Sequence, residues 1–187
     1  MSLNLLQNIQ ENLGYPPLQK IDPNLQDIAT DPTTPNENRL AQAAIPSALL
    51  ALYKYIKTDE GADAVKRENY SPNWVDLVFA DVKEEAVNRI AAYAHYQNNI
   101  VEEHLATVLN EAVRLFREQK AVNAEANTDN VEQMIATERN NILPYLPASL
   151  NMGELFGDTT VDDKTNKMEG PISSLMHKIE SAFSNPK

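Results

Sequence analysis

Apolar side chains recur along this chain at intervals of three and four residues, and this spacing limits the possible folds more than any other feature. It is the spacing that brings side chains together on one face of an α-helix. Alternating runs of β-branched residues are absent, and the five glycines leave little material for hairpin turns. We therefore predict an all-α fold, an irregular orthogonal array of about six to eight helices with a tethered amphipathic C-terminal helix.

The length and the residue types of the chain determine what can stabilise such a fold. A chain of 187 residues is suited to one domain with appended terminal segments. A globule of this size buries roughly 70% of its unfolded surface, so it needs neither a disulfide nor a metal ion. Because the sequence contains no cysteine, disulfides, thiolate zinc sites, iron–sulfur clusters and a cysteine nucleophile are excluded.

Changes in composition divide the chain into four parts. Residues 1–35 predict an N-terminal helix and a proline-rich connection, and residues 36–157 predict a helical core domain. Residues 158–170, DTTVDDKTNKMEG, are polar and almost free of apolar side chains, which is typical of a linker. Residues 171–187 predict the amphipathic C-terminal helix.

The first helix is expected from Leu3 to Leu13. Ser2 stands at its N-cap position, and Gly14 follows as a terminator. The spaced prolines of residues 15–35 prevent a continuous helix. We expect these residues to form an extended, mostly ordered connection.

A second helix is expected from residue 35 toward Lys57. The Thr34 hydroxyl is placed to cap this helix, with Pro35 at its first helical position. Pro46 lies in the middle and predicts either a kink or two abutting helices. The polar residues 58–69, which include Gly61, predict a connection with at most one helical turn.

Further capping signals predict the remaining helices of the core. Ser71-Pro72 opens one helix, and the aspartate-x-x-glutamate pattern at Asp81 indicates a fresh start rather than one long rod. The expected helices run from 81 to about 97, from 100 to about 119, and from 128 to about 143, with a short helix after Pro147.

Histidines and carboxylates gather in the segment AHYQNNIVEEHLATVLNEAV, which contains His95 and His104. Di-iron and di-manganese bundles need a glutamate three residues before a histidine on each of two helices. Ala92 and Val101 occupy those positions here. Histidines four residues apart, as in zinc proteases, are also absent.

Two interpretations of this segment stay open. In the first, Asn99 caps a helix, Glu102 completes a capping box and Glu103 complements the helix dipole. His104 then lies at the edge of the buried stripe, half-buried with an ordinary hydrogen bond. In the second, His95 and His104 meet across the corner between their helices and bind a metal ion or small ligand with Glu102 or Glu103.

The same segment also has the layout of a helix-turn-helix, with a turn at Asn98-Asn99. A recognition helix needs basic side chains near its start. This helix begins with Glu102 and Glu103, and the net charge of the chain is −11. Such a surface repels phosphate, so we predict no nucleic-acid partner.

No sequence pattern marks an enzyme. The G-x-S-x-G elbow, the G-x-G-x-x-G pattern and the P-loop are all absent. We therefore predict no catalytic residue and no cofactor. The N-terminus lacks the features of a signal peptide, and the most apolar stretch, AAIPSALLALY, is about half the roughly 20 residues that cross a bilayer. These observations predict a cytoplasmic protein without a membrane partner.

The C-terminal helix has the cleanest amphipathic pattern of the chain. Its stripe consists of Ile172, Leu175, Met176, Ile179 and Phe183. Such a stripe on a polar tether either packs on its own domain, for example against residues 3–13, or enters a groove of another chain. We predict that it binds a protein partner or a second copy of this chain.

Three segments resemble the YidB-like proteins, small helical bacterial proteins of uncharacterised function. The segments are PNENRLAQAAIPSALLALYKYI, the proline-bounded ILPYLPASLNMGELFGD and the tail PISSLMHKIESAF, together about a quarter of the chain. The resemblance implies an all-α, homeodomain-like helical fold and carries over no catalytic residue. The residues and the resemblance together predict a non-catalytic intracellular protein that acts by protein–protein interaction, in a regulatory or structural role. The alternative is a metal- or small-ligand-binding helical bundle that uses His95, His104 and nearby carboxylates.

Overall fold

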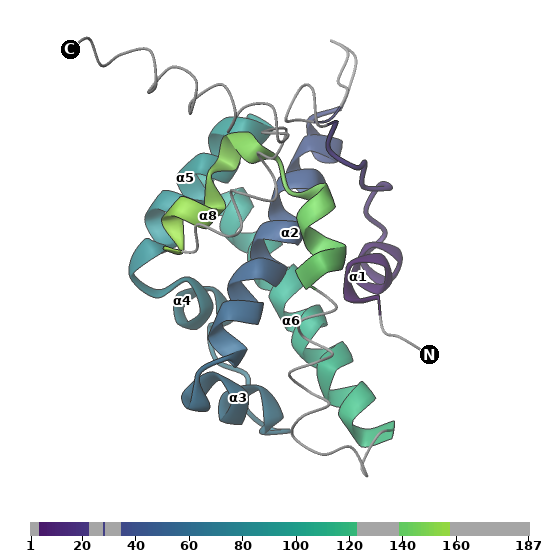
Figure 1. Ribbon diagram of the computed structural model, residues 1–187, viewed down its shortest axis with the longest axis vertical. Coiled ribbons are helices and arrows are strands. Elements are labelled where there is room, and N and C mark those ends of the chain that lie inside the picture. Colours follow the sequence, from purple (N-terminus) through teal and green to yellow (C-terminus); the bar gives the residue numbers. More distant parts are fainter. Residues whose placement is uncertain (1–3, 23–27, 29–34, 123–138, 158–187) are drawn as a thin grey trace, which may run out of the picture.

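The computed structural model describes residues 4–22, 28, 35–122 and 139–157, and these residues form an all-α structure (Figure 1). The predicted fold class is confirmed, because the described part contains seven α-helices and no β-strand. The α-helices are α1 (Leu5–Leu13), α2 (Asn36–Ile56), α3 (Asp59–Lys66), α4 (Trp74–Phe79), α5 (Lys83–Ala94), α6 (Asn98–Val122) and α8 (Met152–Leu155). The 3-10 helices are η1 (Ala80–Val82), η2 (Leu143–Tyr145) and η3 (Ala148–Leu150), and residues 139–142 are also helical.

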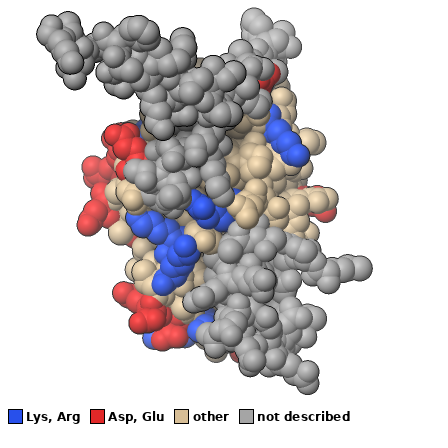
Figure 2. Space-filling view, viewed as in Figure 1, with Lys and Arg blue, Asp and Glu red and all other residues tan. Residues whose placement is uncertain are grey.

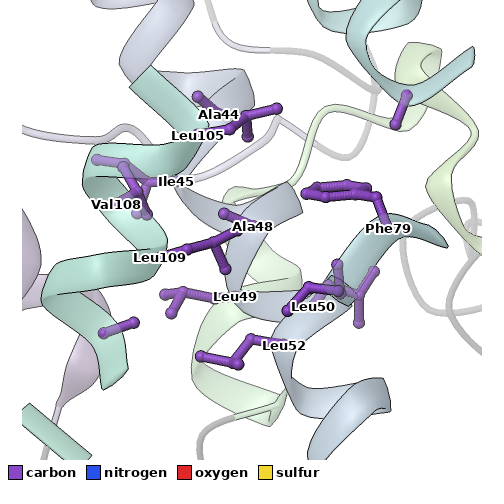
Figure 3. Packing of buried hydrophobic residues seen from close by; sticks show 14 of the residues in the cluster. Ala44, Ile45, Ala48, Leu49, Leu50, Leu52, Phe79, Leu105, Val108 and Leu109 are labelled. Atoms are coloured by element: carbon purple, nitrogen blue, oxygen red, sulfur yellow. The ribbon is translucent and has the colours of Figure 1, made fainter. Parts of the chain in front are cut away.

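Helix α2 is the centre of the molecule. All thirteen residues from 40 to 52 are buried, and α2 packs against α1, α3, α4, α5 and α6. A helix that is apolar all round must be covered on every side. Figure 3 shows how its alanines and leucines meet residues of α6 such as Leu105 and Leu109. This burial on all sides makes α2 the core around which the other helices pack.

Pro46 does not divide α2 into two helices. The helix continues through it from Asn36 to Ile56. Proline removes one backbone donor and therefore weakens the ladder at the carbonyl of Gln42. Burial on all sides offsets that local loss, because the apolar neighbours of α2 cover the helix on both sides of Pro46, from residue 40 to residue 52.

The predicted caps are partly wrong. Helix α1 begins at Leu5, two residues later than predicted, and the side chain of Asn4 accepts a hydrogen bond from the Gln7 amide at 3.1 Å. Gly14 ends the helix in the left-handed conformation, as predicted, with φ of 68°. Helix α4 is capped by Asn73 rather than by Ser71.

At α2, Pro35 occupies the N-cap position instead of the first helical position. Thr34, the predicted cap, lies outside the described residues. Helix α5 begins after η1 and is a separate helix from α4, as predicted. Its N-cap is Val82, which has no side-chain capping bond, so the predicted cap at Asp81 is wrong.

Residues 59–66 form helix α3, where a connection was predicted. The Thr58 side chain caps it by accepting a hydrogen bond from the Gly61 amide at 3.0 Å. Gly61 packs directly on the end of α2, because a β-carbon at this position would lie 1.9 Å from the Tyr55 carbonyl oxygen. The polar residues of this segment gave no apolar pattern from which the short helix could be predicted. Only a glycine at position 61 allows the helix to pack so close to α2.

The last described segment, residues 139–157, crosses α2 and α5 with short helical turns, as expected from Pro144 and Pro147. None of the helices within the described ranges is both long and apolar enough to cross a membrane. The linker 158–170 and the helix 171–187 lie outside the described residues, so the predicted division of the chain stays a prediction.

Candidate functional site

The corner between α5 and α6 differs from the predicted capping box. Helix α5 ends at Ala94, and the exposed His95 adopts the left-handed conformation with φ of 58°. Helix α6 begins at Asn98, so Asn99 is inside the helix and is not its cap. The carbonyl of Gln97 accepts the first backbone hydrogen bonds. The left-handed turn at His95 shortens α5, which lets α6 begin earlier than its polar residues suggested.

Glu102 pairs with a lysine instead of completing a capping box. Its carboxylate lies 3.5 Å from the Lys83 ammonium, which also binds the Asp76 carboxylate at 2.9 Å. The hydrogen bond to Asp76 and the charge of Glu102 raise the pKa of Lys83. This ion-pair network connects α4, α5 and α6 at the surface.

His104 is half-buried and hydrogen-bonded, as predicted. Its Nδ1 lies 2.6 Å from the hydroxyl of Tyr15, and the two ring centroids are 5.7 Å apart. In the neutral tautomer whose proton is on Nε2, the imidazole accepts the hydrogen bond of the phenol at Nδ1. Burial, and secondly the charge of Glu37, raise the pKa of Tyr15 to about 12. The phenol therefore stays protonated and holds the residue after α1 against α6.

A second polar contact joins the same two helices. The Asn12 amide donates to the Glu111 carboxylate at 2.7 Å, and Arg114 binds that carboxylate at 2.6 and 2.8 Å. These hydrogen bonds, from Arg114 first, hold the pKa of Glu111 below its ordinary value against the opposing effect of burial. Together with Tyr15 and His104, this contact forms a polar seam between α1 and α6.

The three candidate metal ligands are in different settings. His104 uses Nδ1 for Tyr15, while His95 is exposed at the end of α5 and Glu103 is exposed on the first turns of α6. Within the described ranges, no three histidine, aspartate or glutamate side chains are grouped to hold a metal ion. The ligand-binding alternative stays a prediction, which metal analysis of the purified protein and thermal melts with added zinc, iron or manganese would test.

The most connected polar side chain of the interior is Gln42 of α2, which is 2% exposed. Its Oε1 accepts from the Gln19 amide at 2.9 Å, and its Nε2 donates at 2.9 Å to the carbonyl of the same residue. The same Nε2 also donates to the Tyr145 carbonyl. Sequence reasoning missed Gln42, although one glutamine in the otherwise apolar run LAQAAIPSALL was a signal.

Basic side chains bind backbone carbonyls at several junctions between helices. Arg117 donates to the carbonyls of Val65 and Tyr70 at 2.8 and 2.9 Å. Arg89 donates to the carbonyl of Asn151 at 2.8 Å, and Lys54 binds the carbonyl of Phe156. Charge-assisted bonds of this kind satisfy carbonyls at helix ends. In the view of Figure 2, Lys and Arg side chains lie between two acidic areas of the surface.

The predicted partner-binding residues, Ile172, Leu175, Met176, Ile179 and Phe183, lie outside the described residues. No protein-family model, curated protein or solved structure matches this chain. The resemblance to the YidB-like proteins therefore stays a prediction.

Proposed function

We propose that this chain is a non-catalytic intracellular protein that acts by protein–protein interaction through residues 171–187. The observation that carries the proposal is the apolar stripe of this segment, with its members at i, i+3, i+4, i+7 and i+11. A stripe of this spacing is the pattern of a helix that lies in an apolar groove. The thirteen residues 158–170 tether it to the core domain.

The described part supports this proposal by the way its polar side chains are used. Gln42, Arg89 and Arg117 bind backbone groups of their own chain. His104 is bound to Tyr15, and Glu111 to Arg114. These side chains stabilise the helical core, which is the expected behaviour of a scaffold rather than of a reactive centre.

The contacts of α1 favour a partner outside the core domain. The apolar side chains of α1, Leu5, Leu6 and Ile9, are buried, and this helix packs on α2 and α6. Helix α1 was the predicted cis partner of the C-terminal stripe. Since α1 uses its apolar side on its own core, we propose that the stripe of residues 171–187 enters a groove of another chain.

The resemblance to the YidB-like proteins belongs to the same proposal, because it carries over no catalytic residue. It is consistent with a small helical protein that acts by binding a partner through its surface and not by catalysis.

Truncation tests this function. We would compare the full chain with a chain that ends at Glu169, by light scattering for mass and by thermal unfolding for stability. The proposal expects a larger assembly for the full chain, loss of that assembly on truncation, and the same midpoint of unfolding for the core. Two equally stable monomers with the same binding partners would contradict it.

A matched pair of variants separates the stripe from the segment as a whole. Leu175→Asp with Ile179→Asp places two charges in the stripe. Ser174→Asp with Ser181→Asp places the same two charges on the opposite face of the helix, because that face is about 180° away. The first pair should abolish assembly and the second should leave it unchanged.

A further inference from the structure

Residues 15–22 form an extended segment beside α2, which we call the strap. It follows α1 and runs along α2 next to the segment 139–157, where the Ile21 amide donates to the Pro144 carbonyl at 2.8 Å (Figure 1). None of its eight residues is fully buried: Pro17, Gln19 and Lys20 are exposed and the others are half-buried. Tyr15 and Leu18 supply its apolar contacts with the core.

The strap is recognised through its backbone. Both the N–H and the C=O of Gln19 are bound by the side-chain amide of Gln42, each at 2.9 Å. The amide of Leu18 donates to Gln10 at 3.1 Å. The Gln19 side chain itself is exposed. An amide side chain that pairs with both groups of one residue binds an extended peptide as a neighbouring strand does.

Gln42 is held ready for this contact. It is 2% exposed and lies on the helix with the most complete burial. Its Nε2 also binds the carbonyl of Tyr145, so η2 fixes the orientation of the amide. The receptor residue of the contact is fully buried, while every residue of the bound segment is half-buried or exposed.

We propose that Gln42, oriented by the Tyr145 carbonyl, forms with the Pro144 carbonyl a binding site for an extended peptide, and that the strap of a second copy of this chain can replace the chain's own strap there. The strap is the segment that occupies this site in the structure. A second copy of the chain carries the same segment, so we take a second copy as the occupant. Twelve residues, 23–34, connect the strap to α2, and a chain of that length spans at most about 40 Å. Reciprocal exchange uses the same contacts in both arrangements, so its cost is low.

A synthetic peptide of residues 14–22, GYPPLQKID, tests the site on the full chain. The acceptor is Gln19→Pro, which removes the strap's N–H for Gln42 while the receptor residues stay unchanged. Because the chain's own strap then competes less well, the labelled peptide should bind this variant at least about tenfold more tightly than wild type, by fluorescence anisotropy. Adding Gln42→Met to the variant should remove that gain, and a peptide that itself carries Gln19→Pro should not bind.

Equal peptide binding by wild type and Gln19→Pro would overturn the proposal, as would binding that survives Gln42→Met. If Gln19→Pro does not fold, the isotope-labelled wild-type chain replaces it. Excess peptide should then shift the amide resonances of Gln19 and Ile21 and the side-chain amide of Gln42, and leave those of α5 unchanged. The absence of any shift at millimolar peptide would be equally decisive against the site.

Light scattering at increasing concentration of the wild-type chain tests the occupant. A dimer that dissociates on addition of the peptide supports exchange with a second copy. A chain that binds the peptide but stays monomeric contradicts the second copy as the occupant. The chain that ends at Glu169 retains the whole site, so it should form the same peptide-sensitive dimer, whereas an assembly made through residues 171–187 should be lost in it.

Discussion

Helix α2 and the strap lie side by side and are stabilised in opposite ways. Every residue of α2 from 40 to 52 is buried, whereas no residue of the strap is. The stability of α2 comes from the burial of apolar surface, and each buried side chain adds to the area that is removed from water. The strap is held by directed hydrogen bonds, chiefly the reciprocal pair between the Gln42 side chain and the Gln19 backbone. The comparison teaches that one molecule contains a segment that resists local opening and a neighbour that permits it.

Removing a buried side chain from α2 should have the largest effect. Leu49 is 2% exposed, so Leu49→Ala should lower the free energy of unfolding by about 2–5 kcal/mol through the lost transfer energy and the cavity left behind. Leu18→Ala in the half-buried strap is the matched control and should cost about 1 kcal/mol. Urea unfolding followed by circular dichroism measures both. Equal losses would break the contrast between the two segments.

Gln42 and Gln19 share two hydrogen bonds, in which Gln42 uses its side chain and Gln19 uses its backbone. Gln42→Met leaves the backbone groups of Gln19 and the Tyr145 carbonyl without this partner, which should cost about 1–3 kcal/mol in unfolding free energy. Gln19→Ala keeps the backbone and should change stability by less than about 0.5 kcal/mol. A larger loss in Gln19→Ala than in Gln42→Met, in the same urea assay, would contradict recognition through the backbone.

The Tyr15 hydroxyl at the start of the strap should contribute less to the free energy of unfolding than the Gln42 side chain does. Tyr15→Phe removes the bond to His104 and should cost about 0.5–1.5 kcal/mol at neutral pH. The pKa of Tyr15 is about 12 in the folded protein and 10.0 ordinarily, so the folded state holds this proton more tightly. The contribution is fully present below pH 10 and is lost as the pH rises toward 12. Stability curves of both proteins should therefore converge above pH 10, and a constant difference would contradict the assignment.

Substitution of Glu111, in the seam between α1 and α6, should have the smallest effect on the free energy of unfolding. Its ordinary pKa is 4.5, and hydrogen bonds from Arg114 and Asn12 lower the pKa in the folded state. The stabilisation is present above the ordinary pKa and is lost as the pH falls through the lower folded-state pKa. Glu111→Gln should cost less than about 1 kcal/mol at neutral pH, and the cost should disappear in acid. Asp63→Asn, at an exposed pair with Lys66, is the control for the loss of a surface carboxylate.

The helical fold was predictable because its causes are local. The apolar period and the terminator Gly14 act within one or two turns, and both predictions are confirmed. The length of helix α3 was underestimated because the close approach of Gly61 to the Tyr55 carbonyl depends on packing. The cap at Asn99 was wrong because α5 already ends at the left-handed His95 and α6 begins at Asn98, which places Asn99 inside the helix.

The polar contacts were not predictable because they join distant parts of the chain. The half-burial of His104 followed from its place beside an apolar stripe, but its partner Tyr15 is 89 positions away in the sequence. Gln42 binds Gln19 across 23 positions and Tyr145 across 103. Nothing in the local pattern selects one partner for an amide that can pair with any backbone group.

Native-state hydrogen exchange tests the contrast between α2 and the strap most directly. The amides of Gln19 and Ile21 should exchange by local opening, with at least about tenfold less protection than the amides of Ala44 and Leu49. Low concentrations of urea should leave the exchange of the strap amides unchanged and accelerate that of the α2 amides, because only global unfolding exposes α2. Equal protection with the same dependence on urea in both segments would show that the strap opens only with the core, which contradicts the account.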